Sequence, residues 1–184
     1  MRITGGSLRG RAIAAPPGRA IRPSADRLRE SLFNVLAHAG SDTVPPLAGA
    51  SVLDAFAGTG ALGLEALSRG AAQAVFLDRD LTWVRRNVEA LGQSARARLI
   101  AGDALHPPDS PTPVGIAFVD PPYGQSLAGP ALAALAESGW IGPSSLAVVE
   151  TGAKERIDWP ARFTVQQSRR YGAALITLMT LWRA

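Results

Sequence analysis

Hydrophobic positions from residue 51 onward form short apolar runs that alternate with longer amphipathic stretches. The apolar runs have the length of buried strands and cover Ser51–Phe56, Ala74–Asp78, Arg98–Ala101, Ile116–Val119 and Leu146–Glu150. The stretches between them have helical spacing and include Gly60–Arg69, Leu81–Leu91 and Leu127–Glu137. Strands that alternate with helices in this way predict an α/β fold, in which helices cover a mostly parallel sheet.

The C-terminal part of the chain departs from that alternation. Phe163–Val165 and Ala173–Trp182 predict two further strands, joined through residues 169–172 without a helix between them. Two strands connected this closely pair antiparallel, so we expect a hairpin at the edge of the sheet.

The N-terminal part is different again. Residues 1–23 are rich in glycine, proline and arginine and predict short strands or loop. A helix is predicted over Asp26–His38, and Ser24 stands where it can cap the start of that helix. The predicted organisation is therefore an N-terminal extension over residues 1–45 and a Rossmann-like domain over residues 46–184.

Composition removes several classes of protein. With 184 residues, 47% of them hydrophobic, the chain can bury a single core. No apolar run reaches the roughly 18 residues of a membrane-spanning helix, and the N-terminus lacks the apolar core of a signal peptide. There is no cysteine, and the two histidines lack metal-ligand spacing. We expect a cytoplasmic monomer that needs neither a membrane nor a metal ion.

Positive charge is concentrated at the N-terminus. The net charge is +4, and the first 29 residues hold seven arginines but only one acid, Asp26. A basic extension of this kind is typical of a segment that binds a polyanion. The whole chain has only one lysine, so part of the arginine content reflects a general preference for arginine over lysine. We predict that the nucleic-acid contacts include Arg2, Arg9, Arg11, Arg22 and Arg27.

A glycine-rich loop joins the first predicted strand of the sheet to the helix that follows it. Gly58, Gly60 and Gly63 have the spacing of a dinucleotide-binding loop, which lets a ligand approach the backbone closely. Asp54 favours S-adenosylmethionine instead, because its carboxylate can accept a hydrogen bond from the ammonium group of that cofactor. The predicted cofactor contacts in this segment are Asp54, Phe56, Ala57, Gly58 and Gly60.

Two later strands also end near acidic residues. Asp78 lies 20 positions beyond Gly58, where an acid can bind the two hydroxyls of a ribose. Asp103 follows the third strand, next to Ala104, and can accept a hydrogen bond from an adenine amino group. An aspartate at such a turn can instead bind its own backbone, and that alternative stays open for Asp103.

The most informative stretch is Asp120-Pro121-Pro122-Tyr123, which follows an apolar strand. The prolines fix the backbone and remove two N–H donors, so nearby carbonyl groups keep set directions. Asp120 and the Pro121 carbonyl can accept hydrogen bonds from an exocyclic amine and free its lone pair for attack on a methyl group. Tyr123 provides a ring on which a base can stack, which stabilises binding by about 1–3 kcal/mol. We predict that these four residues are catalytic.

Together these motifs resemble a known family. Asp54–Gly60 followed by Asp120–Tyr123 is similar to the S-adenosylmethionine-dependent amino-methyltransferases, and Arg2–Arg11 with Arg22–Asn34 resembles their bacterial 16S ribosomal RNA guanine-N2 branch. The resemblance implies a seven-stranded sheet with its last strand antiparallel, and an N-terminal hairpin that reaches RNA. It also implies that Ser24–Glu30 partly closes the cofactor pocket, so Ser24 joins the predicted cofactor contacts.

The substrate implied by the resemblance is 16S ribosomal RNA or the small ribosomal subunit. Three alternatives remain open from the sequence. Adenine-N6 methyltransferases that act on DNA or RNA share the catalytic motif, nicotinamide-dependent oxidoreductases share the glycine spacing, and an RNA-binding module could keep the fold without catalysis.

Overall fold

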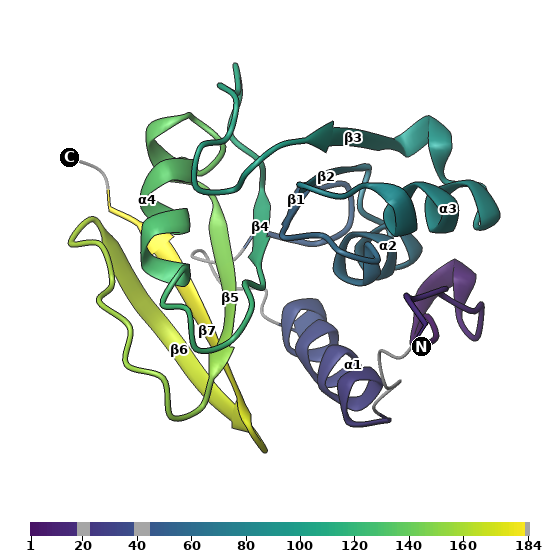
Figure 1. Cartoon of the computed structure of the whole chain (residues 1–184), viewed down its shortest axis with the longest axis horizontal. Coiled ribbons are helices and arrows are strands. Elements are labelled where there is room, and N and C mark those ends of the chain that lie inside the picture. Colours follow the sequence, from purple (N-terminus) through teal and green to yellow (C-terminus); the bar gives the residue numbers. More distant parts are fainter. Residues whose placement is uncertain (18–22, 39–44, 183–184) are drawn as a thin grey trace.

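The computed structural model describes residues 1–17, 23–38 and 45–182, and the side chains of all of these except residues 23–25 and 38. Within these residues seven strands form one sheet in the order β3-β2-β1-β4-β5-β7-β6 (Figure 1). The strands are β1 (Ser51–Ala55), β2 (Gln73–Asp78), β3 (Ala97–Ala101), β4 (Ile116–Val119), β5 (Leu146–Gly152), β6 (Phe163–Tyr171) and β7 (Ala174–Leu181). β1 to β5 are parallel and β7 is antiparallel to both of its neighbours, which confirms the predicted fold class.

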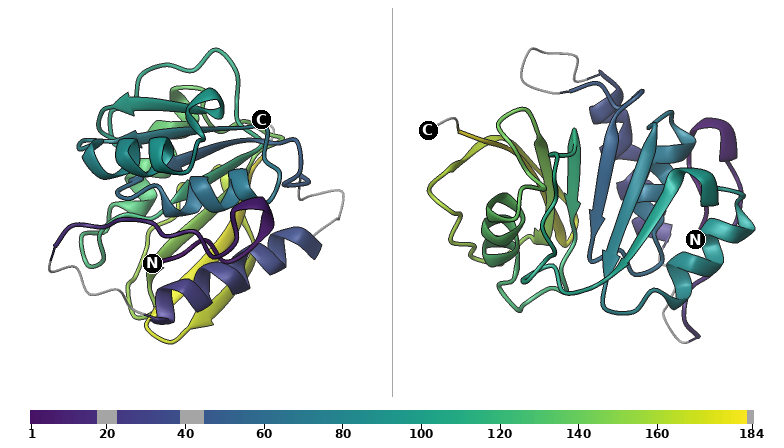
Figure 2. Two further views of the ribbon diagram at one scale, coloured as in Figure 1. Left: turned by 90° about the vertical axis from the view of Figure 1, so that its right-hand side faces the viewer. Right: turned by 90° about the horizontal axis from the view of Figure 1, so that it is seen from above.

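In the described part of the chain, four α-helices cover the two faces of this sheet. They are α1 (Pro23–His38), α2 (Ala61–Ser68), α3 (Thr82–Ala90) and α4 (Ala128–Glu137). α1, α2 and α3 pack on one face together with the N-terminal segment, and α4 packs on the other (Figure 2). Each face therefore has its own cluster of buried apolar side chains, because alternate residues of a strand point to opposite faces.

The C-terminal hairpin shows where the sequence prediction was wrong. β6 continues from Phe163 to Tyr171, whereas the prediction ended at Val165 and treated residues 169–172 as the connection. A register shift between Val165 and Gln167 interrupts the alternation of the strand, and β6 is an edge strand whose middle residues are largely exposed. Its sequence therefore lacks the apolar pattern by which buried strands were identified.

The N-terminal extension packs into the same core as the sheet. Ile3, Ile13 and Phe33 are fully or almost fully buried in the cluster on the α2 face. The first segment folds back on itself through the bridge between Arg2 and Ala12, with a 3-10 helix (Gly6–Leu8) between its two arms. Its position against the sheet therefore does not depend on α1 alone (Figure 2).

A buried acid on α2 holds this extension in place. The carboxylate of Glu65 accepts hydrogen bonds from the backbone N–H groups of Thr4 and Gly5, both at 2.8 Å, and forms ion pairs with Arg29 on α1 and Arg69. Burial by itself would raise the pKa of Glu65, but the hydrogen bonds from Thr4 and Arg69 outweigh it and lower the pKa. The ionised carboxylate thus ties the extension and α1 to the sheet domain.

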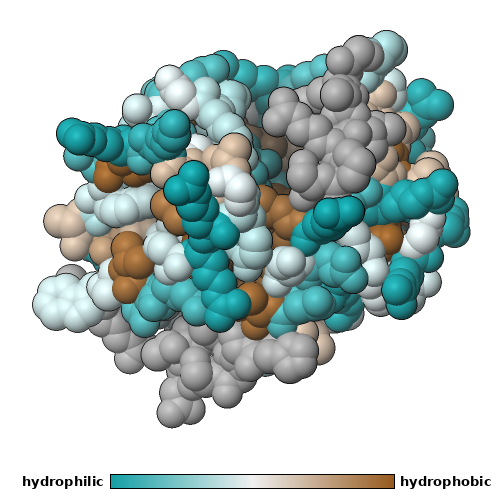
Figure 3. Space-filling model, turned by 90° about the horizontal axis from the view of Figure 1, so that it is seen from below, coloured by the Kyte–Doolittle hydropathy of each residue, from teal (hydrophilic) through white to brown (hydrophobic). Residues whose placement is uncertain are grey.

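The face of the molecule seen from below is mostly hydrophilic (Figure 3). Viewed from below, charged and polar side chains project outward and apolar surface lies in the recesses between them (Figure 3). Among the helices that the structure describes, none is long and apolar enough to cross a membrane.

Candidate active site

Four neighbouring strands each carry an acidic residue at or near their carboxyl ends, and all four acids belong to the same face of the sheet. The residues two positions earlier are Val52, Phe76, Phe118 and Val148, which are buried in the cluster under α1, α2 and α3. Since side chains two residues apart point to the same face, the acids share that face. They are Asp54, Asp78, Asp120 and Glu150.

These acids line one cavity of about 850 Å³, within the range of small-molecule and cofactor sites. The cavity opens at the carboxyl ends of the strands, which is where α/β sheets bind ligands. Most of the residues that we predicted to be catalytic or to bind the cofactor line it: Asp54, Phe56, Ala57, Gly58, Asp78, Asp103, Ala104, Asp120, Pro121, Pro122 and Tyr123. The structure thus brings together side chains that are up to 69 positions apart.

Asp54 lies at the bottom of the cavity and is 1% exposed. Its Oδ2 accepts a 2.8 Å hydrogen bond from the backbone N–H of Gly63, while Oδ1 accepts none from the described residues. Burial raises the pKa of Asp54 to about 7, against the lowering effect of the Gly63 hydrogen bond and with a further rise from the nearby charge of Asp78. A cation beside Oδ1 would favour the ionised form of this carboxylate.

The side chain of Asp78 fixes the glycine loop. Its Oδ2 accepts a 2.7 Å hydrogen bond from Gly58 N–H, and its Oδ1 accepts a 3.0 Å bond from Asp80 N–H. Each carboxylate oxygen can accept a second hydrogen bond, so Asp78 can also receive the hydroxyls of a ribose. The same residue therefore shapes the loop and presents acceptors to the cavity.

Gly60 is a predicted cofactor contact that does not line the cavity. Its φ is +76°, a left-handed conformation, and a Cβ atom there would lie 2.6 Å from Cγ2 of Val84 on α3. At the next glycine, Gly63, a Cβ atom would lie 2.4 Å from Cε1 of Phe76 on β2. Tight packing of α2 on β2 and α3 is one reason for glycine at both positions, and the close approach of a ligand to this loop stays a prediction.

Asp103 adopts the turn geometry that the sequence left open. Its Oδ1 accepts a 3.0 Å hydrogen bond from Leu105 N–H, and its Oδ2 pairs with Arg79 at 2.6 Å. The hydrogen bond from Arg79 and that from Leu105 lower the pKa of Asp103, so this acid stays ionised near neutral pH. It lines the cavity with Ala104, and a role toward adenine stays a prediction.

The proline turn begins one residue after β4. The backbone N–H of Asp120 points to the Ala55 carbonyl of β1 at 3.4 Å, which continues the pairing of β1 with β4. Pro121 is buried, whereas Pro122 is exposed and Tyr123 is 46% exposed. The turn therefore places Asp120 inside the cavity and Tyr123 at its rim.

The N-terminal extension supplies one wall of the cavity, through Met1, Ala15, Pro16, Leu28 and Arg29. This agrees with a pocket that α1 partly closes. The predicted contact Ser24 cannot be placed, since its side chain lies outside the described residues.

The arginines predicted to bind nucleic acid do not line the cavity. Arg2, Arg9, Arg11 and Arg27 are exposed, and Arg22 lies outside the described residues. Arg2 and Arg11 each donate a hydrogen bond to a backbone carbonyl, at 2.9 and 3.0 Å. Because the guanidinium group has five N–H donors, both side chains keep donors for a phosphate.

Glu150 and Trp83 are among the cavity residues that the sequence analysis missed. Glu150 on β5 accepts a hydrogen bond from the hydroxyl of Tyr123. The sequence does contain a pattern that could have identified Glu150, because this acid follows a buried valine by two positions near the end of its strand, as Asp54 does. Trp83 on α3 lines the cavity and carries the Arg86 guanidinium 5.6 Å from its ring centre. A single tryptophan gave no signal that it faced a ligand.

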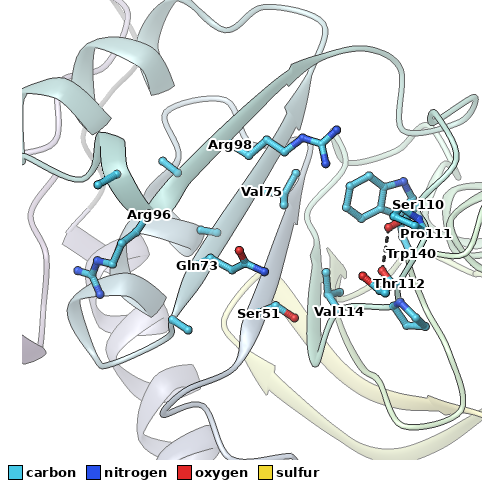
Figure 4. Close-up of a pocket in the computed structure, with 15 residues that line it drawn as sticks. Ser51, Gln73, Val75, Arg96, Arg98, Ser110, Pro111, Thr112, Val114 and Trp140 are labelled. Carbon is cyan, nitrogen blue, oxygen red and sulfur yellow. Dashed lines mark hydrogen bonds between the residues drawn. The ribbon is translucent and has the colours of Figure 1, made fainter.

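A second hollow, of about 310 Å³, lies near the amino ends of β1, β2 and β3. Arg96 and Arg98 point in opposite directions there, and Arg98 extends toward Trp140 and the loop of Ser110 (Figure 4). The guanidinium of Arg96 is already bound to the carbonyl of Ala71. This hollow contains none of the predicted site residues and lies at the edge of the sheet opposite to the usual ligand site.

The residues of the large cavity fit S-adenosylmethionine. Asp54 is a buried carboxylate suited to an ammonium group, Asp78 offers acceptors to a ribose, and Trp83 provides an aromatic wall. Among the described residues no group of three or more metal-binding side chains is close enough to hold a metal ion.

Comparisons with known proteins show the family to which the chain belongs. Residues 1–180 match the family described as conserved hypothetical protein 95. The chain is 35% identical to ribosomal RNA small subunit methyltransferase D of Escherichia coli strain K12, over 94% of this chain and 85% of the relative. It is 32% identical to the protein of the same name from Haemophilus influenzae, over 94% of this chain and 89% of that relative.

The fold is shared with a solved structure as well. The yhhF protein of Escherichia coli, described provisionally as a methyltransferase, superposes with a TM-score of 0.82 at 33% identity, and the match covers 100% of this chain and 99% of that one. The chain therefore belongs to the conserved hypothetical protein 95 family and to the ribosomal RNA small subunit methyltransferase D family that the sequence resembles.

Proposed function

We propose that this chain transfers a methyl group from S-adenosylmethionine to the exocyclic N2 amine of a guanine in 16S ribosomal RNA, as naked RNA or within the small subunit. The coarser activity, S-adenosylmethionine-dependent methylation of ribosomal RNA, follows from its family. The observation that supports the finer proposal is the position of Asp120 and Tyr123 at the same cavity as Asp54 and Gly58.

In this site Asp54 would hold the ammonium group of the cofactor and Asp78 its ribose, and Gly58 in the glycine loop would let the cofactor approach the backbone. When bound, S-adenosylmethionine supplies a methyl group on a positively charged sulfur, which leaves as a neutral thioether when the methyl carbon bonds to nitrogen. The protein must then place an amine beside that methyl group and keep the lone pair of the amine available.

Asp120 and the carbonyl of Pro121 do this by accepting hydrogen bonds from the two N–H groups of the amine. Those bonds favour a pyramidal nitrogen, and they strengthen as positive charge develops on it during attack. The nitrogen loses one proton after the bond forms, so no strong base is required. Tyr123 stacks against the base and keeps its plane fixed.

The extension contributes to binding of the RNA. Arg9 and Arg11 are exposed on the segment that Glu65 holds against α2. Their positive charges attract phosphates at a fixed position relative to the cavity, and phosphate contacts determine the register of a nucleic acid on a protein.

The test is methyl transfer to small ribosomal subunits that lack the modification, with naked RNA and DNA in parallel and the labelled nucleosides identified after digestion. Asp120→Ala should lower the rate by about 10²-fold or more, because it removes an acceptor for developing charge. Its affinity for S-adenosylmethionine should stay unchanged. Asp109→Ala, the same change at an exposed acid outside the cavity, is the matched control.

N2-methylguanosine from RNA would support the whole proposal. Label in N6-methyladenine would leave the role of Asp120 intact and replace the substrate. A normal rate for Asp120→Ala would refute the mechanism.

A further inference from the structure

Glu150 is a cavity residue that the mechanism above does not use. The pairing of β4 with β5 places Val119 opposite Val149, so the next position along brings Asp120 beside Glu150. Neighbouring strands lie about 4.8 Å apart, and both acids belong to the same face of the sheet. A second carboxylate therefore stands next to the residue that receives the amine.

The partner of Glu150 is the stacking residue itself. The hydroxyl of Tyr123 donates a hydrogen bond to Oε1 of Glu150, across 27 positions of sequence. Tyr123 lies in a turn just before Gly124, whose φ is +74°, and 46% of its surface is exposed. The two prolines fix the backbone of this turn but do not themselves set the side-chain torsions of Tyr123. The hydrogen bond fixes the far end of the ring.

An acid suits this position better than a neutral polar residue. An ionised carboxylate only accepts hydrogen bonds, so the tyrosine hydroxyl must be the donor and its direction is set. Burial raises the pKa of Glu150, and the hydrogen bond from Tyr123 opposes that rise. The chain thus keeps a partly buried acid on β5 that accepts a hydrogen bond from a residue of the proline turn.

We propose that Glu150 is a positioning residue for methyl transfer: it holds the ring of Tyr123 at the rim of the cavity so that the stacked base presents its amine to Asp120. This inference rests on the proposed function, since it assumes that a base stacks on Tyr123. Glu150 acts through Tyr123, so its removal affects the placement of the base and leaves the cofactor contacts at Asp54 and Asp78 unchanged.

The kinetic test is single-turnover methyl transfer with excess enzyme. Glu150→Ala and Tyr123→Phe should each lower the rate by about 10²-fold, the size of effect expected from misplaced reactants. The variant that carries both changes should be no slower than either, because both remove the same contact. Glu150→Gln, whose amide oxygen can accept the same bond, should stay within about tenfold of wild type.

Titration with S-adenosylmethionine should give wild-type affinity for all of these variants. Glu137→Ala, at an exposed acid of α4, is the matched control and should behave as wild type. Losses that multiply in the double variant would overturn the proposal, and so would a Glu150→Gln variant as slow as Glu150→Ala.

A second measurement needs no RNA. The chain has two tyrosines, so Tyr171→Phe leaves Tyr123 as the single source of tyrosine NMR signals. With ring-labelled tyrosine, relaxation should show a restricted ring in this background and with Glu150→Gln, and a freely moving ring with Glu150→Ala. A ring of equal mobility in all three proteins would overturn the proposal. A restricted ring in a protein that methylates no RNA would refute the proposed function and leave the Tyr123–Glu150 contact standing.

Discussion

Replacing Asp54 with asparagine should stabilise the protein without cofactor and, at the same time, weaken its binding of S-adenosylmethionine. The change is nearly isosteric, and the asparagine Oδ1 can still accept the hydrogen bond from Gly63. What it removes is a negative charge that is 1% exposed and near Asp78. Without a cation in the cavity that charge is unfavourable, whereas the proposed contact with the ammonium group of the cofactor requires it.

The size of the effect follows from the pKa. Burial is the largest cause of the rise in the pKa of Asp54 from 3.8 to about 7. The folded protein therefore binds more protons than the unfolded chain between these values, so its free energy of unfolding falls as the pH rises through that range. A rise of this size corresponds to up to about 4 kcal/mol. The penalty is complete above about pH 7 and absent below about pH 4.

Urea unfolding of the wild type and Asp54→Asn across this pH range measures the effect. The variant should be up to about 4 kcal/mol more stable above neutral pH, and the difference should vanish in acid. Comparing the two proteins at each pH cancels the titration of all other groups. A gain that does not depend on pH, or a variant less stable than wild type at high pH, would refute the reasoning.

Calorimetric titration with S-adenosylmethionine should show that the same substitution weakens binding, although it stabilises the protein without cofactor. Below the pKa of Asp54, the affinity of the wild type should increase by up to about tenfold for each unit by which the pH is raised, since binding is proposed to require the ionised carboxylate. Asp54→Asn should bind more weakly, by about tenfold to a hundredfold, and should lack that rise. Equal affinities would show that the ammonium group binds elsewhere.

Three further changes test other parts of the structure. Glu65→Gln should lower the free energy of unfolding by about 3 kcal/mol near neutral pH, because the buried Arg29 loses a negative partner. That loss should shrink in acid, since the ionised Glu65 contributes its stability only above its lowered pKa. Gly60→Ala should lower the melting temperature and cost about 2–4 kcal/mol, from its positive φ and its contact with α3. Replacing Arg9 and Arg11 with serine should weaken RNA binding and flatten its salt dependence by about 1–2 in log–log slope.

Each of these has a matched control in the same chain. Glu137→Gln changes an exposed acid and should leave stability unchanged. Gly49 has a similar φ of +78°, but a Cβ atom added there would have no atom within 4 Å. If Gly49→Ala cost as much stability as Gly60→Ala, the contact with α3 would not be the cause of the loss. Arg162→Ser removes an exposed arginine outside the extension, and an equal change in salt slope would show a nonspecific effect of charge.

The order and type of the elements around the site were predictable from the sequence. A strand buried on both faces is an apolar run, and it ends where polar residues begin, so β1 and β4 were located to within a residue. The helices were predictable because apolar residues recur at helical spacing on the face that packs against the sheet. β6 was cut short because an exposed edge strand with a register shift needs no apolar pattern.

The chemistry of the cavity was also largely in the sequence, since carboxylates at the ends of parallel strands must meet at one edge of the sheet. Asp54, Asp78 and Asp120 were each identified from a motif at a strand end: the glycine loop, the acid 20 positions beyond it and the proline turn. Glu150 also lies near a strand end but belongs to no such motif, and it was overlooked. What the sequence could not give is which side chains pair across the fold. The hydrogen bond from Tyr123 to Glu150 joins residues 27 positions apart, and the hydrogen bond from Thr4 to Glu65 joins residues 61 positions apart. Such contacts depend on how helices and strands pack in three dimensions, and so does the burial that raises the pKa of Asp54. The sequence by itself therefore determined the order of the strands and helices and the residues that could do the chemistry, and only the tertiary structure decided which of them touch and in what charge state.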